Sequence, residues 1–206
     1  MARKVLRLTV DNFIATPSPC RACLFWEFDP VRRSRVDRDD VESEKQAWIS
    51  EVLRDWGSCG RVAMLDEQPV GFIMYAPAAY VPGAMNFPTA PVSADAVLVT
   101  TAYLAPEYRG VGLGRMLVQG VARDLIERGG WKAMECFATV RGTRSGLIPQ
   151  AFLESVGFKT QRPHPTTPRM RMELTSTVRW RDEVETALER MFGAVRPAPE
   201  ATRQNG

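Results

Sequence analysis

The sequence predicts a mixed α/β fold in which helices flank one central sheet. Apolar and β-branched runs of strand length recur along the chain, and two longer segments carry apolar residues at helical spacing. A glycine-rich turn joins one of these strands directly to the second helix. Strands and helices therefore follow one another in the order that is typical of a mixed α/β sheet.

The composition is that of an ordinary globular protein. The chain has 206 residues, of which 45% are hydrophobic and 25% charged, enough to bury a sizeable core in one domain with an appendage. The net charge of +3 is too small to indicate a nucleic-acid partner, although it does not oppose an anionic cofactor. Because there is no apolar run of about 18 residues and no signal-peptide core at the N-terminus, we expect a cytoplasmic protein without membrane contact.

The N-terminal segment is expected to hold one strand and two irregular stretches. Residues 5–14 are largely apolar and β-branched, and a Thr-Pro-Ser-Pro turn closes this predicted strand. Residues 23–28 form a short aromatic run that either extends a sheet edge or lines a pocket. Residues 32–40 are highly charged, so we expect them to be solvated.

A helix and a hairpin are predicted next. Residues 41–56 carry apolar side chains at helical spacing, and Gly57 is placed to end the helix. Residues 61–65 and 70–75 are two apolar runs separated by a short polar turn. This pattern is typical of two paired antiparallel strands.

The second half of the chain is predicted to continue with strand, helix and strand. Residues 76–91 contain four prolines and no clear period, so we expect a loop that helps to cover the substrate. A strand over 96–104 leads into the glycine turn, and the helix that follows ends at Gly129. The remaining predicted elements are a strand over 131–139, a short helix over 148–156, a last core strand over 170–174 and a helix over 182–192.

Residues 102–114, with the sequence AYLAPEYRGVGLG, carry the most specific signal in the chain. Within them Arg109, Gly112 and Gly114 form the pattern R-x-x-G-x-G immediately before a helix. Glycines let the backbone bend tightly and approach a ligand, while the free amides at the start of a helix attract negative charge. The segment therefore predicts a cradle for an anionic group.

Two other glycine-rich motifs do not fit this segment. A P-loop requires Lys and then Ser or Thr after its last glycine, whereas Arg115 and Met116 follow here. A dinucleotide-binding turn requires a third glycine at the position that Arg115 occupies. The other alternative is an ordinary strand-to-helix turn that binds no ligand.

Cys20 and Cys23 form a C-x-x-C pair whose role the sequence leaves open. We expect reduced thiols in a cytoplasmic chain, without a metal. The alternative is half of a zinc or redox site, which would need further ligands such as Cys59 and His164.

The glycine segment resembles the acyl-CoA pyrophosphate loop of the GNAT superfamily of N-acetyltransferases, including the lead-in P-E-Y-R-G at 106–110. This resemblance implies a mixed, mostly antiparallel sheet flanked by helices, with a bulged strand at the cofactor cleft. It covers residues 1–175, so residues 176–194 would form a helical extension and residues 195–206 a disordered tail. We expect the extension either to pack on the domain or to form a homodimer contact.

Residues 151–158, with the sequence AFLESVGF, resemble the second GNAT signature. Phe152, Gly157 and Phe158 match it, and they are packing positions. The family often has a tyrosine after the first phenylalanine, and that tyrosine can protonate the leaving thiolate. This chain has Leu153 there, which cannot donate a proton, and the asparagine often found one to two turns earlier is also missing.

The resemblance implies acetyl-CoA as the acyl donor. Backbone groups of Tyr103 and Leu104 would pair with the pantetheine arm, and Phe152 of the second signature would also contact the donor. The backbone amides of the loop would hold the pyrophosphate, with two arginine side chains as cationic partners. The loop residues concerned are Arg109, Gly110, Val111, Gly112, Leu113, Gly114 and Arg115.

Acyl transfer to an amine requires a base for the amine and an acid for the thiolate. Glu135 is a candidate base because it interrupts the apolar run AMECFA, although a strand carboxylate can also face solvent or pair with an arginine. Asp95 is a second candidate base and Tyr103 a candidate acid. Glu27, within LFWEFD, is a candidate for binding a cationic substrate.

The resulting hypothesis is an N-acyltransferase in which an amine attacks acetyl-CoA directly. The identity of the amine stays open, because the loops that would select it are the least readable parts of the sequence. The alternative is a GNAT-like module that binds acyl-CoA without turnover and acts as a sensor or scaffold. Leu153 is the feature that favours this alternative.

Overall fold

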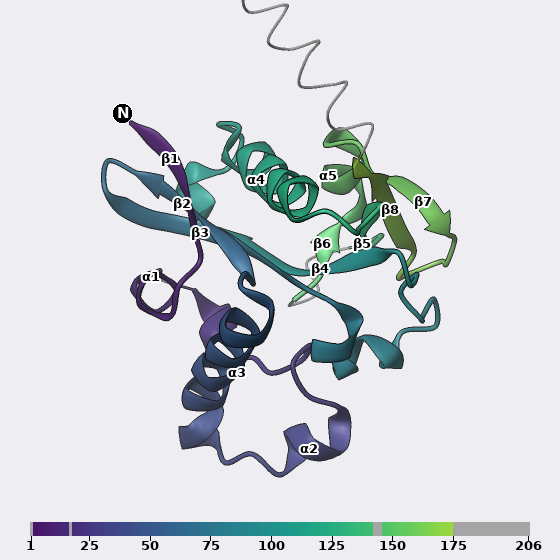
Figure 1. Ribbon diagram of the computed structural model, residues 1–206, viewed down its shortest axis with the longest axis horizontal. Coiled ribbons are helices and arrows are strands. Elements are labelled where there is room, and N and C mark those ends of the chain that lie inside the picture. Colours follow the sequence, from purple (N-terminus) through teal and green to yellow (C-terminus); the bar gives the residue numbers. More distant parts are fainter. Residues whose placement is uncertain (1, 17, 142–145, 175–206) are drawn as a thin grey trace, which may run out of the picture.

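The computed structural model describes residues 2–16, 18–141 and 146–174, which form one eight-stranded sheet with helices on both faces (Figure 1). The strands pair in the order β1-β2-β3-β4-β5-β8-β7, with β6 beside β5. All pairs are antiparallel except β4–β5 and β5–β6, so the predicted mixed, mostly antiparallel sheet is confirmed. The strands are β1 (Arg3–Arg7), β2 (Gly60–Leu65), β3 (Gln68–Ala76), β4 (Ala96–Leu104), β5 (Ala133–Thr139), β6 (Ile148–Pro149), β7 (Lys159–Arg162) and β8 (Arg169–Glu173).

The helices divide the core into two layers, one on each face of the sheet (Figure 1). On one face the sheet packs against α4 (Leu113–Arg128) and α5 (Gln150–Ser155). On the other face it packs against α1 (Val10–Ala15) and α3 (Val41–Trp56), with α2 (Pro30–Ser34) farther from the sheet. Within the described residues, no helix has the length and apolar character needed to cross a membrane.

The long helix α3 has the bounds that its apolar spacing predicts. Trp48, Ile49 and Val52 are buried on its inner face, and Gly57 ends it in the left-handed conformation (φ 83°) that glycine adopts without strain. Lys45 lies on the same buried face and is 1% exposed. A lysine there requires a partner, which the first part of the chain provides.

Strands β4 and β5 separate along their length, and this fork positions the site. Only the start of β4 pairs with β5, through Ala96–Leu98 against Ala133–Glu135. On its other edge β4 carries an extra residue relative to β3, since Ile73 faces Ala102 but Tyr75 faces Val99. The second half of β4 therefore bends away from β5 with one backbone edge unpaired by the sheet, as a bulge in a strand permits.

The N-terminal strand is shorter than predicted. We expected a strand over residues 5–14, but β1 ends at Arg7 and α1 begins at Val10. The reason is a capping box, in which the Thr9 side chain accepts from the Asn12 amide and the Asn12 side chain accepts from the Thr9 amide. Apolar content predicted the strand, whereas the cap determines the helix.

Other boundaries differ for similar local reasons. The predicted helix over 148–156 divides into β6 and the shorter α5, and the proline-rich loop over 76–91 contains short 3-10 turns at Ala78–Tyr80 and Pro82–Asn86. Strand β7 was not predicted because its residues, KTQR, are all exposed and show no apolar alternation. The predicted helical extension over 176–194, with its helix over 182–192, and the predicted tail over 195–206 lie outside the described residues.

Candidate functional site

A cavity of about 480 Å³ lies at the fork, between the start of α4, the helix α5 and the outer half of β4. Its volume is in the range of ligand-binding pockets. Tyr103 and Leu147 line it and also pack against the core on the α3 side. The lining residues are Ile73, Ala102, Tyr103, Leu104, Arg109, Gly110, Gly112, Gly114, Arg115, Leu117, Leu147, Pro149, Phe152, Ser155 and Val156.

The glycine turn presents unpaired backbone amides at one end of this cavity. Gly112 is the N-cap of α4, with φ 88°, and as a glycine it makes no side-chain cap hydrogen bond. The amides of the first turn of a helix have no intrahelical acceptor, and the helix dipole adds positive potential there. Gly110 also has a positive φ of 78°, and a Cβ at either glycine would meet nothing within 4 Å. The turn therefore has the open geometry that anion binding at a helix N-terminus requires.

Arginine side chains hold the turn in place. Arg109 Nε donates to the Leu104 carbonyl at 3.0 Å, which ties the loop to the end of β4. Arg115 Nη2 donates to the Ser155 carbonyl on α5 at 2.9 Å, and Arg3 Nη1 donates to the Val111 carbonyl at 2.8 Å. These bonds fix the backbone and keep guanidinium charge close to it.

The two predicted motifs meet at Gly114 and Phe152. A Cβ on Gly114 would lie 3.0 Å from two ring carbons of Phe152, so glycine lets the two helices approach closely. Leu153 is fully buried in the core on the α4 side and does not line the cavity. The described part of the chain thus provides no hydroxyl at the position where the family often has tyrosine.

The predicted donor-binding residues gather at the cavity with two exceptions. Arg109, Gly110, Gly112, Gly114 and Arg115 line it together with Tyr103, Leu104 and Phe152. The side chain of Leu113 is instead buried in the core beneath the turn, and Val111 is 42% exposed at its outer surface. Both still belong to the turn, where their backbones contribute.

The carboxylates Glu135 and Asp95 lie outside the cavity lining, in a cluster of charges between β5 and β8. Glu135 is fully buried, accepts from Arg171 Nη1 at 3.2 Å and accepts from the Ser93 amide at 3.1 Å. Asp95 accepts from Arg171 Nη1 and Nη2 at 2.9 and 3.1 Å. These hydrogen bonds hold the pKa of Asp95 below its usual range.

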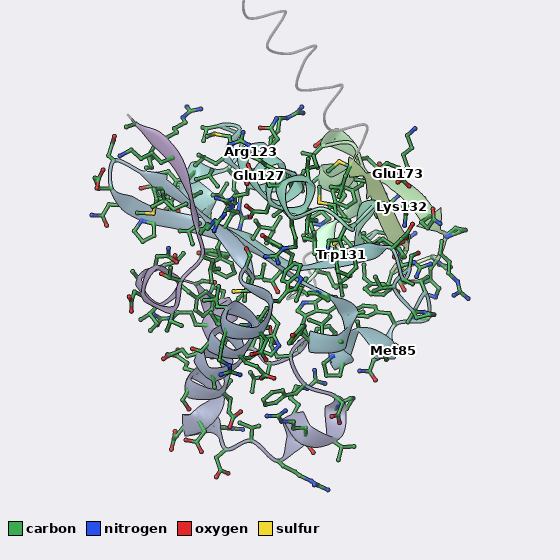
Figure 2. All side chains as sticks on the ribbon, viewed as in Figure 1. Met85, Arg123, Glu127, Trp131, Lys132 and Glu173 are labelled. Carbon is green, nitrogen blue, oxygen red and sulfur yellow. The ribbon has the colours of Figure 1, made fainter. Side chains whose placement is uncertain are left out.

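The outer end of this cluster is Glu173, which accepts from Arg171 Nε at 2.6 Å. Figure 2 shows Glu173 beside Lys132, and the Leu174 amide donates to the Lys132 carbonyl at 2.9 Å. Hydrogen bonds from Arg171 to Asp95 and Glu173 raise the pKa of this arginine. The cluster therefore links two strands and a loop through ion pairs and hydrogen bonds.

Glu27 is also distant from the cavity lining. It is 2% exposed and forms an ion pair with Lys45 Nζ, which also donates to the Cys23 carbonyl at 3.1 Å. This pair fastens the N-terminal segment to α3. The signal in the sequence was Lys45 itself, because a lysine on the apolar face of a helix requires a buried partner.

The cysteines form no metal centre in the described residues. Cys20 and Cys23 are half-buried free thiols, and no group of three potential metal ligands occurs in this part of the chain. Burial raises the pKa of Cys20, and it raises the pKa of Cys59 to about 12. The ring of His164 accepts from the Thr167 amide at 3.1 Å within its own loop, apart from the cysteines.

The wall of the cavity that sequence reasoning missed comes from the segment before α5. Leu147 and Pro149 line the cavity, and the Trp26 indole N–H donates to the neighbouring Gly146 carbonyl at 3.1 Å. Trp26 belongs to the aromatic run whose role was open between sheet edge and pocket wall. Trp26 supports the cavity wall from the core side. In the sequence, the only indication of this role was the aromatic content of the run.

Comparison with solved structures identifies the class of fold. The PaiA N-acetyltransferase from Thermoplasma acidophilum, in complex with coenzyme A, has a TM-score of 0.55 at 16% identity over 84% of this chain and 99% of its own. The aminoglycoside acetyltransferase AAC(6')-Ib, also in complex with coenzyme A, has a TM-score of 0.55 at 17% identity over 87% of this chain and 99% of its own. At these identities the likeness shows the fold, which is that of the N-acetyltransferases.

The family follows from the sequence itself. The model of the acetyltransferase (GNAT) family matches residues 22–158, which include the glycine turn and the whole of the second motif. A search of curated protein sequences finds no significant match. The chain belongs to the GNAT acetyltransferase family, whose members are acetyl-CoA-dependent N-acetyltransferases.

Proposed function

We propose that this protein transfers an acetyl group from acetyl-CoA, bound in the cavity at the fork, to a primary amine. The observation that carries the proposal is the uncapped N-terminus of α4, whose first-turn amides open into a cavity bounded by the unpaired edge of β4. A pyrophosphate fits such a helix N-terminus, and an extended pantetheine arm fits an unpaired strand edge. The two solved relatives that contain coenzyme A support this assignment.

The chain's own groups divide the work between binding and orientation. The amides of the first turn of α4 would hold the pyrophosphate, with Arg109 and Arg115 adding charge. The outer half of β4, which includes Tyr103 and Leu104, borders the fork, and its backbone would orient the arm and the acyl carbonyl. Bound acetyl-CoA would supply the acetyl group as a thioester, with the coenzyme A thiolate as the leaving group. The cavity would hold the thioester carbonyl where an amine can approach it.

Among the three predicted catalytic side chains, Tyr103 is the one that we retain. It lines the cavity, and its ring packs 6.1 Å from that of Phe72, which fixes its orientation. We assign Glu135 and Asp95 a structural role because their carboxylates accept hydrogen bonds from Arg171. The amine would then lose its proton to solvent at the mouth of the fork.

A second candidate function is an acyl-CoA-binding module without turnover. Leu153 favours it, because it places no proton donor at the position where the family often has tyrosine, and it is buried rather than directed at the cavity. This module would bind acetyl-CoA at the same site but would not transfer the acetyl group.

Release of coenzyme A separates the two candidates. The intact chain is incubated with acetyl-CoA and a panel of primary amines, and both coenzyme A and the acetylated amine are quantified by chromatography. The transferase predicts equal amounts of the two products with at least one amine. Amine-independent release alone, at the rate of spontaneous hydrolysis, would favour the binding module.

A further inference from the structure

Arg169 is a buried arginine whose side chain makes no hydrogen bond to any described residue. The residue is 8% exposed, and its Nε and Nη1 atoms are buried without a hydrogen-bond partner. Its nearest charge is Glu135, with Nε 3.5 Å from Oε2 in an orientation that makes an ion pair but no hydrogen bond. Buried guanidinium donors without acceptors are costly, so this group calls for a ligand.

The neighbouring carboxylate pairs with Arg169 in charge but leaves its buried donors without a hydrogen bond, and two other donors share that carboxylate. Glu135 accepts from Arg171 at Oε1 and from the Ser93 amide at Oε2. Arg171, in contrast, is saturated by Asp95, Glu135 and Glu173. Of the two arginines on this face of β8, one is fully bonded and the other keeps its donors unused.

Arg169 lies where β4 and β5 part, on the face of the sheet opposite α4. It pairs in register with Phe137, two residues beyond the last contact of β5 with β4 at Glu135. Phe137 stacks on Phe87 at 4.4 Å and lies 6.2 Å from Trp26 in the core on the α3 side. The indole of Trp26 in turn bonds the Gly146 carbonyl, next to the cavity wall.

The carboxylates on this face already have cationic partners, which argues against an acceptor that carries several positive charges. The carboxylates of Glu135 and Asp95 are bonded to Arg171, and that of Glu27 is paired with Lys45. Glu27 Oε2 also lacks a hydrogen bond, but the ammonium group at its other oxygen compensates its charge. Among these charged groups, Arg169 is therefore the one whose guanidinium keeps hydrogen-bond donors without an acceptor.

We propose that Arg169 binds a carboxylate of the acceptor, so that the acceptor is a small molecule of the amino-acid type with both an amine and a carboxylate. A carboxylate offers two acceptor oxygens to the planar guanidinium donors and would satisfy them as no described residue does. The amine of the same molecule would then lie toward the fork. This assignment rests on the proposed acetyl transfer and specifies its substrate class.

The test compares matched acceptors that differ only in the carboxylate. Leucine is paired with 3-methylbutylamine, and phenylalanine with 2-phenylethylamine, at saturating acetyl-CoA. We expect kcat/KM of the wild-type protein to favour the amino acid of each pair. In Arg169→Met, which keeps an unbranched apolar stem but removes the guanidinium, this preference should fall at least about tenfold through KM, which corresponds to about 1.4 kcal/mol. The pKa values of the free acceptor amines do not depend on the protein variant. The change between variants in the ratio of kcat/KM for the two acceptors of a pair therefore reports the contact with the carboxylate.

Two further proteins control for charge and fold. Arg162→Met removes an exposed arginine on β7, opposite Arg169 in register, and should leave the preference unchanged. Arg169→Lys should restore part of the preference lost in Arg169→Met. Acetyl-CoA affinity, measured by calorimetry, should be the same in all variants and shows that the methionine variant is folded.

A measurement without turnover keeps this inference separate from the proposed function. Titration with 4-methylpentanoate, which has the carboxylate of leucine but no amine, should show binding to the wild-type protein and to Arg162→Met but not to Arg169→Met. Equal binding by Arg169→Met, or an unchanged preference in it, would overturn the role of Arg169. Absence of acetyl transfer to every amine, with carboxylate binding intact, would reject the transferase and retain the carboxylate site.

Discussion

At the scale of single residues, Glu135 shows how a carboxylate inside a strand can have a structural role. The sequence marks it as unusual because it interrupts an apolar run, and the structure surrounds it with Arg169, Arg171 and the Ser93 amide. Its partners are far away along the chain, so no local pattern could have identified them. The residue that sequence analysis proposed as a base holds a sheet and a loop together.

Replacement of Glu135 by glutamine should destabilise the protein more than it alters the chemistry. The change leaves two arginines without their buried counter-charge, and loss of one partner of a buried ion pair costs about 3 to 5 kcal/mol. Urea unfolding measures this loss. Glu173→Gln, at the exposed end of the same cluster, is the control and should cost no more than about 1 kcal/mol. A Glu135→Gln protein of normal stability with a shifted pH–rate profile would instead identify Glu135 as the base.

The hydrogen bonds between Asp95 and Arg171 make a pH-dependent contribution to stability. They lower the pKa of Asp95 in the folded protein below its value of about 3.9 in the unfolded chain. The contribution is therefore complete above the unfolded pKa and is lost as the pH falls through the folded pKa.

Urea unfolding of the wild-type protein and Asp95→Asn across a pH series tests this sign. The difference in unfolding free energy between them should be constant from about pH 7 to about pH 5 and should shrink as the pH falls below about 4. A difference that grows toward low pH would contradict the lowered pKa.

At the scale of elements, the proposed donor site depends on the N-terminus of α4. The elements of that site are a strand that parts from its neighbour, a turn with two glycines at positive φ and a helix whose N-cap glycine has no side chain. Gly112 and Gly57 have nearly the same backbone conformation, with φ 88° and ψ −7° against φ 83° and ψ −1°. Gly57, however, ends α3 and does not line the cavity.

This pair of glycines separates strain from ligand binding. Leucine at either position imposes a similar left-handed strain of about 1 to 2 kcal/mol on folding. Only Gly112→Leu also places a side chain where the pyrophosphate would approach, so its affinity for acetyl-CoA should fall at least about tenfold. Calorimetry and thermal unfolding of both variants check the two effects. An equal loss of affinity in Gly57→Leu would show that strain alone, transmitted through the fold, is responsible.

At the scale of the whole molecule, local signals predicted the elements that form the proposed donor site. The bounds of α3 and β4, and the start of α4, follow from helical spacing, strand composition and terminal glycines, all of which are written in short segments. Strand β7 and the division of residues 5–14 were not predictable from apolar content, because pairing with β8 and a capping box determine them.

The acceptor side of the molecule was the less predictable half of the site. Glu135, Asp95 and Glu27 were recognised as unusual, but their partners come from β8 and α3, and ion pairing over such separations leaves no periodic signal in a sequence. Arg169 carried no signal at all, since an arginine in a short strand is ordinary until its burial and unused donors are known.

The most direct test of the central claim is calorimetric titration of the intact wild-type protein with acetyl-CoA and with coenzyme A. The open amides of α4 and the unpaired edge of β4 predict binding of both in the micromolar range, with one site per chain. No detectable binding of either would show that the glycine turn is a structural strand-to-helix connection, and the proposed acetyl transfer would be rejected with it.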